Sequence, residues 1–312
     1  MPRFGLLALA ASAALLPGLL MATPVHAEAS SLTGKLNAYV GCLNRLSGRA
    51  FDARERYFSW VGKKGPTGKE RIIYGTYTIY DTSDCKSEVE SANMLDPRNG
   101  ELEEAASAYV EAVVTLEPLL KEADDYYSQE DYKDDKMAKG KALHPKLVTA
   151  WTAFANADTK LRSSIDVIQD MLAVEELVNI ESTEGRNARY HIQALMMHAK
   201  RLVRVQSAEK PDLAKIVEML GEYETITKTT EAYAETNKND KIGSSFISSA
   251  KSFLVTAKQL MRRVRDKVPY STGEQMILNA GGGGSWMIEG SPGRLMHDYN
   301  QLVDSYNRGA RF

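Results

Sequence analysis

The chain has 312 residues and a formal net charge of −2 at pH 7, with 39 Lys and Arg against 41 Asp and Glu. A chain of this length buries one large hydrophobic core or two smaller ones. The near-neutral charge argues against a nucleic-acid-binding protein, which normally carries an excess of basic residues.

The first 27 residues have the pattern of an export signal. Arg3 and the amino terminus supply positive charge, residues 4–21 form an apolar run, and small residues precede a cleavage point after Ala27. We expect cleavage there, a mature protein in the periplasm, and no transmembrane segment after cleavage. The alternative is an uncleaved membrane anchor, because an apolar run of 18 residues nearly spans a bilayer. No cysteine lies near the cleavage point, so we expect no lipid-anchored amino terminus.

Helical periodicity dominates the rest of the chain, with apolar residues recurring every three or four positions. Residues 31–62 show this pattern first. A loop rich in glycine and lysine follows at 62–71. Residues 71–80 read RIIYGTYTIY and alternate β-branched with aromatic side chains. They have no obvious strand partner, so we expect a short extended segment lying over a helical bundle.

Cys42 and Cys85 are the two cysteines of the chain. An even pair in an oxidising compartment predicts one disulfide, which would close a loop of 43 residues. The alternative is a pair of buried free thiols. Neither cysteine belongs to a CxxC arrangement, so redox catalysis has no support in the sequence.

Further helices follow along the chain. They are predicted at 100–129, 145–181, 186–207, 211–236 and 244–268. A glycine-rich hinge at 279–291 precedes a C-terminal helix, for which Ser291 is the expected N-cap and Pro292 the first helical position. The predicted fold is all-α, an elongated antiparallel bundle of long helices with a short extended segment near residues 71–80. We expect one helical domain over residues 28–312.

Three blocks of the sequence point to a family. They read NAYVGCLNRLSGRAFDARERYFSWV, YYSQEDYKDDKMAKGKALHPKL and EGSPGRLMHDYNQLVDSYNR, in that order. Together they resemble the YiiG-like bacterial envelope proteins, a family of unknown function, over roughly residues 33–309. The resemblance implies a helical protein of the cell envelope and supplies no catalytic residues.

Residues 126–145 combine tyrosines, carboxylates and a histidine more densely than other stretches. The pattern favours a solvated connection between two helices, whose tyrosines pack back on the core. The alternative is a surface that binds a ligand or a partner protein, formed by aromatic, acidic and imidazole side chains together with a tryptophan of the glycine-rich hinge. The candidates for this surface are Tyr126, Tyr127, Asp131, Tyr132, Asp134, Asp135, His144 and Trp286. A Ca²⁺ site is disfavoured, because the spacing and the glycine of an EF-hand loop are missing.

The remaining motifs favour binding over catalysis. HExxH and GxSxG are absent, so the sequence supports neither a zinc peptidase of that type nor a nucleophile elbow. Residues 84–135 hold 16 acids and 4 bases, which indicates either solvated helix faces or a polarity that steers partners. We expect a non-enzymatic interaction module of the cell envelope that uses no metal or cofactor and binds an unknown envelope protein or ligand. The alternative is an enzyme of an unrecognised class, with its site around His144 and the nearby Asp/Tyr cluster.

Overall fold

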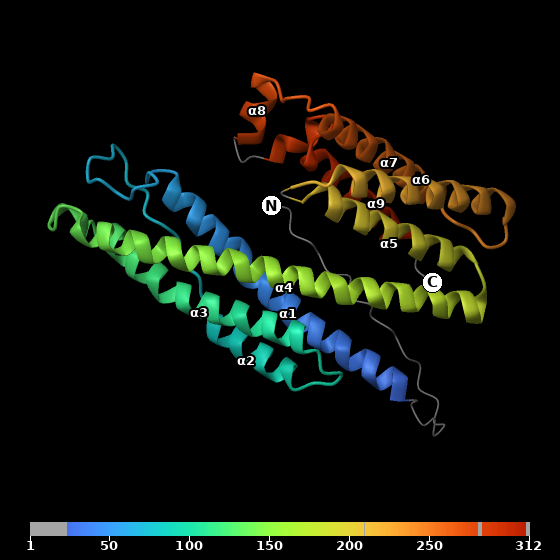
Figure 1. Ribbon diagram of the computed structural model, residues 1–312, viewed down its shortest axis with the longest axis horizontal. Helices are drawn as coiled ribbons and strands as arrows, with labels where there is room; N and C mark the ends of the chain where they lie inside the picture. Colours follow the sequence, from blue (N-terminus) through green and yellow to red (C-terminus); the bar gives the residue numbers. More distant parts are fainter. Residues whose placement is uncertain (1–23, 209, 280–282, 310–312) are drawn as a thin grey trace. The chain divides into compact units, whose positions relative to one another are not determined.

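The computed structural model describes residues 24–208, 210–279 and 283–309, which form α-helices joined by loops and short 3-10 turns (Figure 1). No strand occurs in these ranges, so the predicted all-α fold class is confirmed. None of the helices described there combines the length and the hydropathy of a membrane span. The predicted signal peptide, residues 1–27, lies outside the described residues except for its last four positions.

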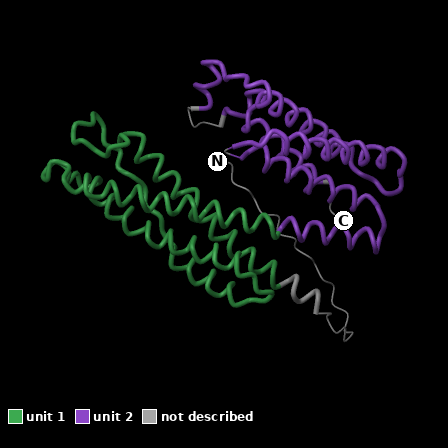
Figure 2. Tube along the Cα trace, in the orientation of Figure 1, with its two compact units in different colours: residues 1–168 green, residues 169–312 purple. Residues whose placement is uncertain are grey.

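The chain divides into two compact units, residues 1–168 and 169–312 (Figure 2). The boundary lies within helix α4 (Ala138–Glu184), so one continuous helix contributes residues to both units. That residues 28–312 form a single helical domain stays a prediction. It implies that both units unfold together in one cooperative transition.

Unit 1 is a bundle of helices. It contains α1 (Pro24–Phe58), α2 (Thr82–Asn93), α3 (Gly100–Ser128), the 3-10 turn η1 (Asp131–Lys133) and the first part of α4. Helix α2 packs against both α1 and α3. From α4, the ring of Phe154 contacts Phe51 of α1 and Tyr109 of α3. The predicted helix at 100–129 corresponds closely to α3, whose inner face is buried as its periodicity indicates.

Helix α2 is not apparent in the hydrophobic pattern of the sequence. Its buried face is made of Thr82, Cys85, Val89 and Ala92, which recur at helical spacing but are mostly small or polar. Cys85 on this face forms a disulfide with Cys42 of α1, with the two Cα atoms 5.2 Å apart. The predicted disulfide is therefore confirmed, and it links α2 covalently to α1.

A buried ion pair connects α1 to the start of α3. The ammonium of Lys35 is fully buried, 2.6 Å from a carboxylate oxygen of Glu103, and donates to the carbonyl of Pro97 at 2.9 Å. Arg98 makes two-pronged hydrogen bonds to the same carboxylate, the shortest 2.7 Å long. The hydrogen bond from Arg98, and then that from Lys35, lowers the pKa of Glu103 to about 2, against burial, which acts to raise it.

A second polar network lies between α1, α3 and α4. The hydroxyl of Ser47 donates to Asp158 at 2.6 Å and lies 2.8 Å from the hydroxyl of Tyr109. Asp158 is also paired with Arg162, one helical turn further along α4. Because buried polar groups are costly without partners, these bonds favour one relative register of the three helices.

The segment after α1 is extended, as the sequence predicts. Residues 69–81 contain neither helix nor strand. The side chains of Thr76 and Ile79 are buried against the bundle, and the hydroxyl of Thr76 donates to the carbonyl of Ala53 in α1 at 3.0 Å. The segment is thus fastened along α1 by side chains rather than by strand pairing.

Unit 2 is a second helical bundle. It contains the end of α4, then α5 (Ala188–Gln206), α6 (Leu213–Thr236), α7 (Ser244–Arg265), α8 (Thr272–Asn279), the 3-10 turn η2 (Gly283–Met287) and α9 (Pro292–Gly309). Its core takes fully buried residues from α5, α6, α7 and α9, among them Leu195, Phe253 and Leu302. Helices α5, α6, α7 and α9 correspond to predicted helices, whereas the short α8 was not predicted.

The start of α9 confirms the expected cap. The hydroxyl of Ser291 accepts from the backbone N–H of Arg294 at 3.0 Å and donates to the carbonyl of Ser285 at 2.9 Å. Of the predicted hinge at 279–291, residues 280–282 lie outside the described residues. The stretch from Gly283 forms η2, so this part of the hinge has helical structure.

Removal of the disulfide should destabilise the protein. Closing a loop of 43 residues restricts the unfolded chain, and the chain-entropy relation gives a loss of about 4 kcal/mol for a Cys42→Ala/Cys85→Ala variant. Urea denaturation with and without a reductant measures it. The wild type should lose stability on reduction while the double variant is insensitive to the reductant. Equal midpoints for reduced and oxidised wild type would contradict this expectation.

The Glu103 pair should make stability depend on pH. Because the pKa of Glu103 falls from 4.5 to about 2 on folding, its charged form stabilises the native state above pH 4.5, and this contribution disappears as the pH falls toward 2. Glu103→Gln should therefore lower the free energy of unfolding at pH 7, and the difference from wild type should narrow in acid. Glu104→Gln, which alters an exposed neighbour, is the control. If the difference in free energy of unfolding between wild type and Glu103→Gln were the same at all pH values, the stabilising role of charged Glu103 would be refuted.

Candidate functional site

The stretch 126–145 is the connection from α3 through η1 into α4. Tyr126 and Tyr127, on the last turn of α3, are almost fully buried, with 1% and 5% of their surface exposed. Asp131 and Asp134 are exposed, and Tyr132 is half-buried with its ring centroid 6.4 Å from those of both buried tyrosines. The structure therefore brings the three tyrosines together, with the two acids on the solvent side.

Asp135 has a structural role at the start of α4. Its carboxylate accepts from the backbone N–H groups of Ala138 at 3.1 Å and Lys139 at 2.8 Å, and from the hydroxyl of Tyr126 at 2.8 Å. These bonds, that from Lys139 first, lower the pKa of Asp135. Because a carboxylate satisfies free N–H groups at a helix start, α4 begins at Ala138 and not near Pro145 as predicted.

His144 lies inside α4 and not in an extended conformation as the following proline suggests. Pro145 is tolerated within the helix, and only 8% of His144 is exposed. Its Nδ1 atom lies 3.1 Å from the hydroxyl of Tyr57, and the two rings are stacked with centroids 5.9 Å apart. Within the described residues, no carboxylate is a hydrogen-bond or ion-pair partner of His144. The group that the enzymatic alternative requires, an imidazole beside two acids, is not assembled around it.

Tyr57 is the centre of an aromatic cluster at this end of unit 1. Its fully buried ring contacts those of Trp60, Tyr127 and Trp151 at centroid distances of 5.4–6.3 Å. Burial raises the pKa of Tyr57 to about 12. Trp60 donates from its indole nitrogen to the carbonyl of Gly75 at 2.9 Å. The cluster thus joins the ends of α1 and α3 and the start of α4, and it holds the extended segment.

Two glycines let the chain after α1 close over this cluster. Gly65 has a φ of +97°, and a Cβ atom there would lie 3.0 Å from the His144 ring. Gly75 has a φ of +67°, and a Cβ atom there would lie 3.3 Å from Tyr127. Larger residues rarely adopt such backbone angles, so both positions suit glycine. The predicted site residues Tyr127 and His144 therefore serve as packing partners of this loop.

Trp286 lies in η2 of unit 2, whereas the other predicted site residues lie in unit 1. Its ring is stacked on that of His297, with the centroids 4.9 Å apart and the planes at 25°. It is 42% exposed, so the indole is available to a partner on one side.

The sequence did not single out a row of exposed tyrosines on the extended segment. Tyr74, Tyr77 and Tyr80 are 47%, 38% and 52% exposed. The guanidinium of Arg49 lies 5.0 Å from the ring of Tyr80 and 5.4 Å from that of Tyr77, and the guanidinium of Arg56 lies 4.6 Å from Tyr77 and 5.9 Å from Tyr74. We call these five residues the tyrosine–arginine ladder. Cations and rings alternate along it, which is a favourable electrostatic arrangement.

Hydrogen bonds fix the ladder in place. Arg49 donates to the carbonyl of Thr78 at 2.8 Å, and Arg56 donates to the carbonyl of Tyr74 at 2.9 Å and to the hydroxyl of Tyr77 at 3.1 Å. A signal for it exists in the sequence. The tyrosines recur at every third position, and the two arginines are seven residues apart, which places them on one face of α1.

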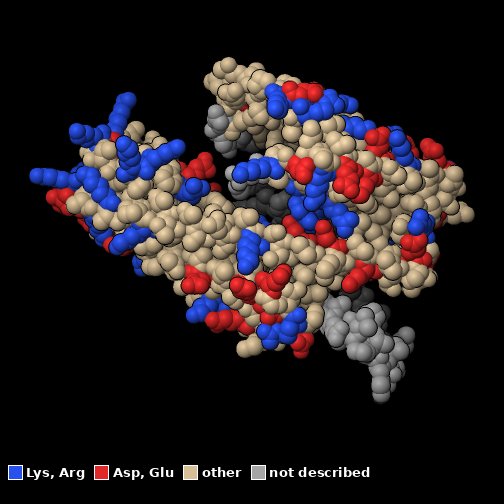
Figure 3. Space-filling model, in the orientation of Figure 1, with Lys and Arg blue, Asp and Glu red and all other residues tan. Residues whose placement is uncertain are grey.

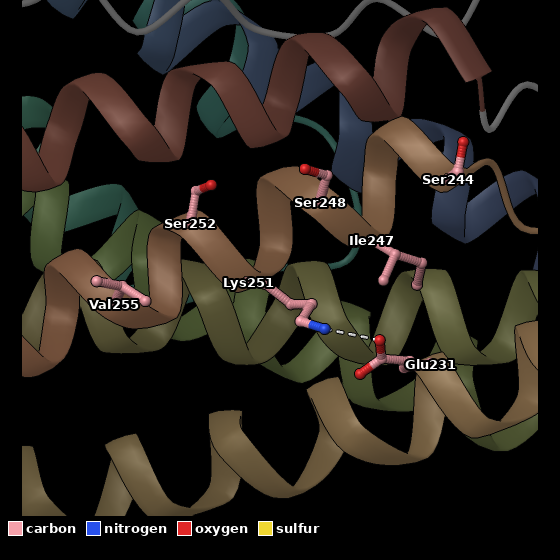
Figure 4. A pocket seen from close by; sticks show the side chains of 7 residues that line it. All are labelled: Glu231, Ser244, Ile247, Ser248, Lys251, Ser252 and Val255. Carbon is pink, nitrogen blue, oxygen red and sulfur yellow. Dashed lines mark hydrogen bonds and ion pairs between the residues drawn. The ribbon is translucent and has the colours of Figure 1, made fainter.

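A shallow pocket on α6 and α7 offers little chemistry. Figure 4 shows Ser244, Ser248 and Ser252 along α7, with Lys251 reaching to Glu231 of α6 at 2.7 Å. The ammonium and the carboxylate neutralise each other, and the serines have no histidine among the residues that line the pocket. In the part of the chain that the structure describes, no group of three or more His, Cys, Asp or Glu is arranged to hold a metal ion.

Substitution of Gly65 should weaken the closure of the loop. Gly65→Ala introduces strain at a positive φ and a contact with His144, so the free energy of unfolding should fall by about 1–3 kcal/mol. Gly62→Ala is the matched control, because no atom lies within 4 Å of its added Cβ, and it should change stability by less than about 0.5 kcal/mol. Chemical denaturation measures both, and equal losses would show that the His144 contact is not the cause.

Comparison with known proteins gives a family. The family model described as "Protein of unknown function (DUF3829)" matches residues 30–308. The chain is 36% identical over 292 residues to "Uncharacterized protein YiiG" of Escherichia coli (strain K12), which covers 92% of this chain and 81% of that protein. No solved structure matches the chain. The chain therefore belongs to the DUF3829 family of proteins of unknown function, in agreement with the YiiG-like resemblance of its three sequence blocks.

Proposed function

We propose that this protein is an exported, non-enzymatic interaction module of the cell envelope, located in the periplasm after cleavage behind Ala27. The leader pattern of residues 1–27 supports export. The disulfide between Cys42 and Cys85 supports an oxidising compartment, because structural disulfides persist outside the cytoplasm.

The observation that carries the interaction role is the tyrosine–arginine ladder. Tyr and Arg are enriched at protein interfaces and at their energetic hot spots. Here three tyrosines are about half exposed and are held in fixed positions by Arg49 and Arg56. A surface that is ordered before binding loses less conformational entropy when a partner docks.

Residues of the stretch 126–145 pack against the loop that leads into the ladder. Gly68 lies against Met137, so the loop after α1 sits directly on the connection between α3 and α4. We therefore include the accessible Asp131, Tyr132 and Asp134 in the proposed binding surface. Tyr126, Tyr127, Asp135 and His144 act on it as positioning residues through their packing and hydrogen bonds.

The enzymatic alternative has less support at the same place. A general acid or base needs access to substrate and a partner that adjusts its pKa. His144 is buried against Gly65 and pairs with the hydroxyl of Tyr57. An interaction role needs only the exposed side chains that the ladder presents.

Site-specific photocrosslinking in the intact envelope tests the proposal. A photoreactive phenylalanine at Tyr77 should give discrete adducts with an envelope component, identified by mass spectrometry. The same probe at Val217, a 51% exposed residue of α6, is the control for incidental contacts. Tyr74→Ala/Tyr80→Ala should reduce the adducts formed at position 77. Identical adducts from positions 77 and 217, or none from either, would refute an interaction surface at the ladder.

A further inference from the structure

The end of α1 and the loop that follows it are basic. Residues 49–71 hold seven basic and three acidic residues, a net charge of +4, in a chain whose formal charge is −2. Figure 3 shows Lys and Arg side chains gathered over this end of unit 1. The adjoining connection, residues 129–141, has four acids and four bases and so adds no net charge. The positive charge therefore belongs to the end of α1 and the loop that follows it.

The cations of residues 49–71 have no carboxylate partners in the part of the chain that the structure describes. Within the described residues, none of the seven basic side chains of 49–71 forms an ion pair. Lys63, Lys64, Lys69 and Arg71 are all exposed on the loop. Glu70, the acid among them, accepts from the loop backbone at Thr67 (2.6 Å) and is held within its own turn. The loop thus presents cations to whatever lies outside it.

Exposed apolar surface accompanies this charge. Ile72, which follows the loop directly, is 51% exposed and precedes the three ladder tyrosines. Tyrosine side chains combine an apolar ring with a polar hydroxyl, and they are favoured at the level of lipid headgroups, where apolar and polar surroundings meet. Cations beside half-exposed aromatic and aliphatic side chains match the chemistry of an anionic membrane surface.

We infer that the loop 62–71 and the tyrosine–arginine ladder form a docking surface for membranes that contain anionic phospholipids. The loop cations bind headgroup phosphates, and Ile72 with the ladder tyrosines enters the headgroup layer. This inference rests on the proposed interaction function and names its partner.

A membrane fits these observations better than a glycan polymer. Sugars bind proteins by stacking on aromatic ring faces, but guanidinium groups already lie 4.6–5.9 Å from the ring centroids of the ladder. A soluble acidic polymer would pair with the lysines and leave Ile72 in water. The boundary between headgroups and acyl chains accommodates the cations and the apolar side chains together.

Vesicle cosedimentation with the full mature chain tests the inference. The protein should sediment with vesicles of phosphatidylglycerol and phosphatidylethanolamine, and not with vesicles of phosphatidylcholine alone. Rising salt should weaken the binding, because ions screen exposed charges. Lys63→Gln/Lys64→Gln/Lys69→Gln should lower the affinity at least about tenfold, since each basic residue near an anionic surface adds favourable energy. Ile72→Ser should lower the affinity without changing its salt dependence.

The matched control removes the same charge elsewhere. Lys210→Gln/Lys215→Gln/Lys238→Gln alters three exposed lysines of unit 2 and should leave vesicle binding unchanged. Thermal unfolding of each variant verifies that it folds. Equal binding to both vesicle types, no binding to the anionic ones, or an equal loss in the control would overturn the inference. If Tyr77 gave crosslinked protein partners but the protein did not bind vesicles, the membrane inference would be rejected and the proposed interaction function kept. If neither crosslinks nor vesicle binding were found, both the inference and the proposed function would be rejected.

Discussion

The contact between Tyr57 and His144 is the interaction on which the end of unit 1 depends. It joins the last turn of α1 to the beginning of α4, and Tyr127 of α3 packs against the same ring. A buried hydroxyl without a partner is costly, and the imidazole nitrogen 3.1 Å away supplies that partner. The end of α1 is thereby held against the end of α3 and the start of α4, which follow it much later in the chain.

The packing around Tyr57 and His144 determines the path of the chain after α1. The loop must cross over the His144 ring and then over Tyr127, and Gly65 and Gly75 permit both close approaches. The extended segment leaves this crossing alongside α1, within reach of Arg56 and Arg49. The half-exposed tyrosines therefore follow from the packing beneath them. A segment without strand partners becomes an ordered surface because side chains of a helix bind its carbonyl groups.

The interior of unit 1 contains charges and hydroxyls that serve structure. Lys35 and Glu103 are paired with each other and with neighbouring groups, and Ser47 joins Tyr109 to Asp158. These groups face other helices, whereas the cations of the loop 62–71 face outward without carboxylate partners in the described part of the chain. These paired groups in the interior support the fold, and the loop cations at one end are presented to solvent. This arrangement is consistent with the proposed interaction module.

The sequence alone determined the helical class, most long helices, the Cys42–Cys85 pair and the Ser291 cap, because these features follow from local periodicity, residue chemistry or cysteine number. It did not show α2, whose buried face is small and polar, or the early start of α4 at the Asp135 cap. The sequence also indicated that tyrosines of the stretch 126–145 pack on the core, and Tyr126 and Tyr127 are buried. Only the tertiary structure decided that His144 is buried with them, and that Arg49 and Arg56 meet tyrosines 18 to 31 residues further along the chain. Such burial and ring contacts depend on segments distant in the chain, which no local pattern records.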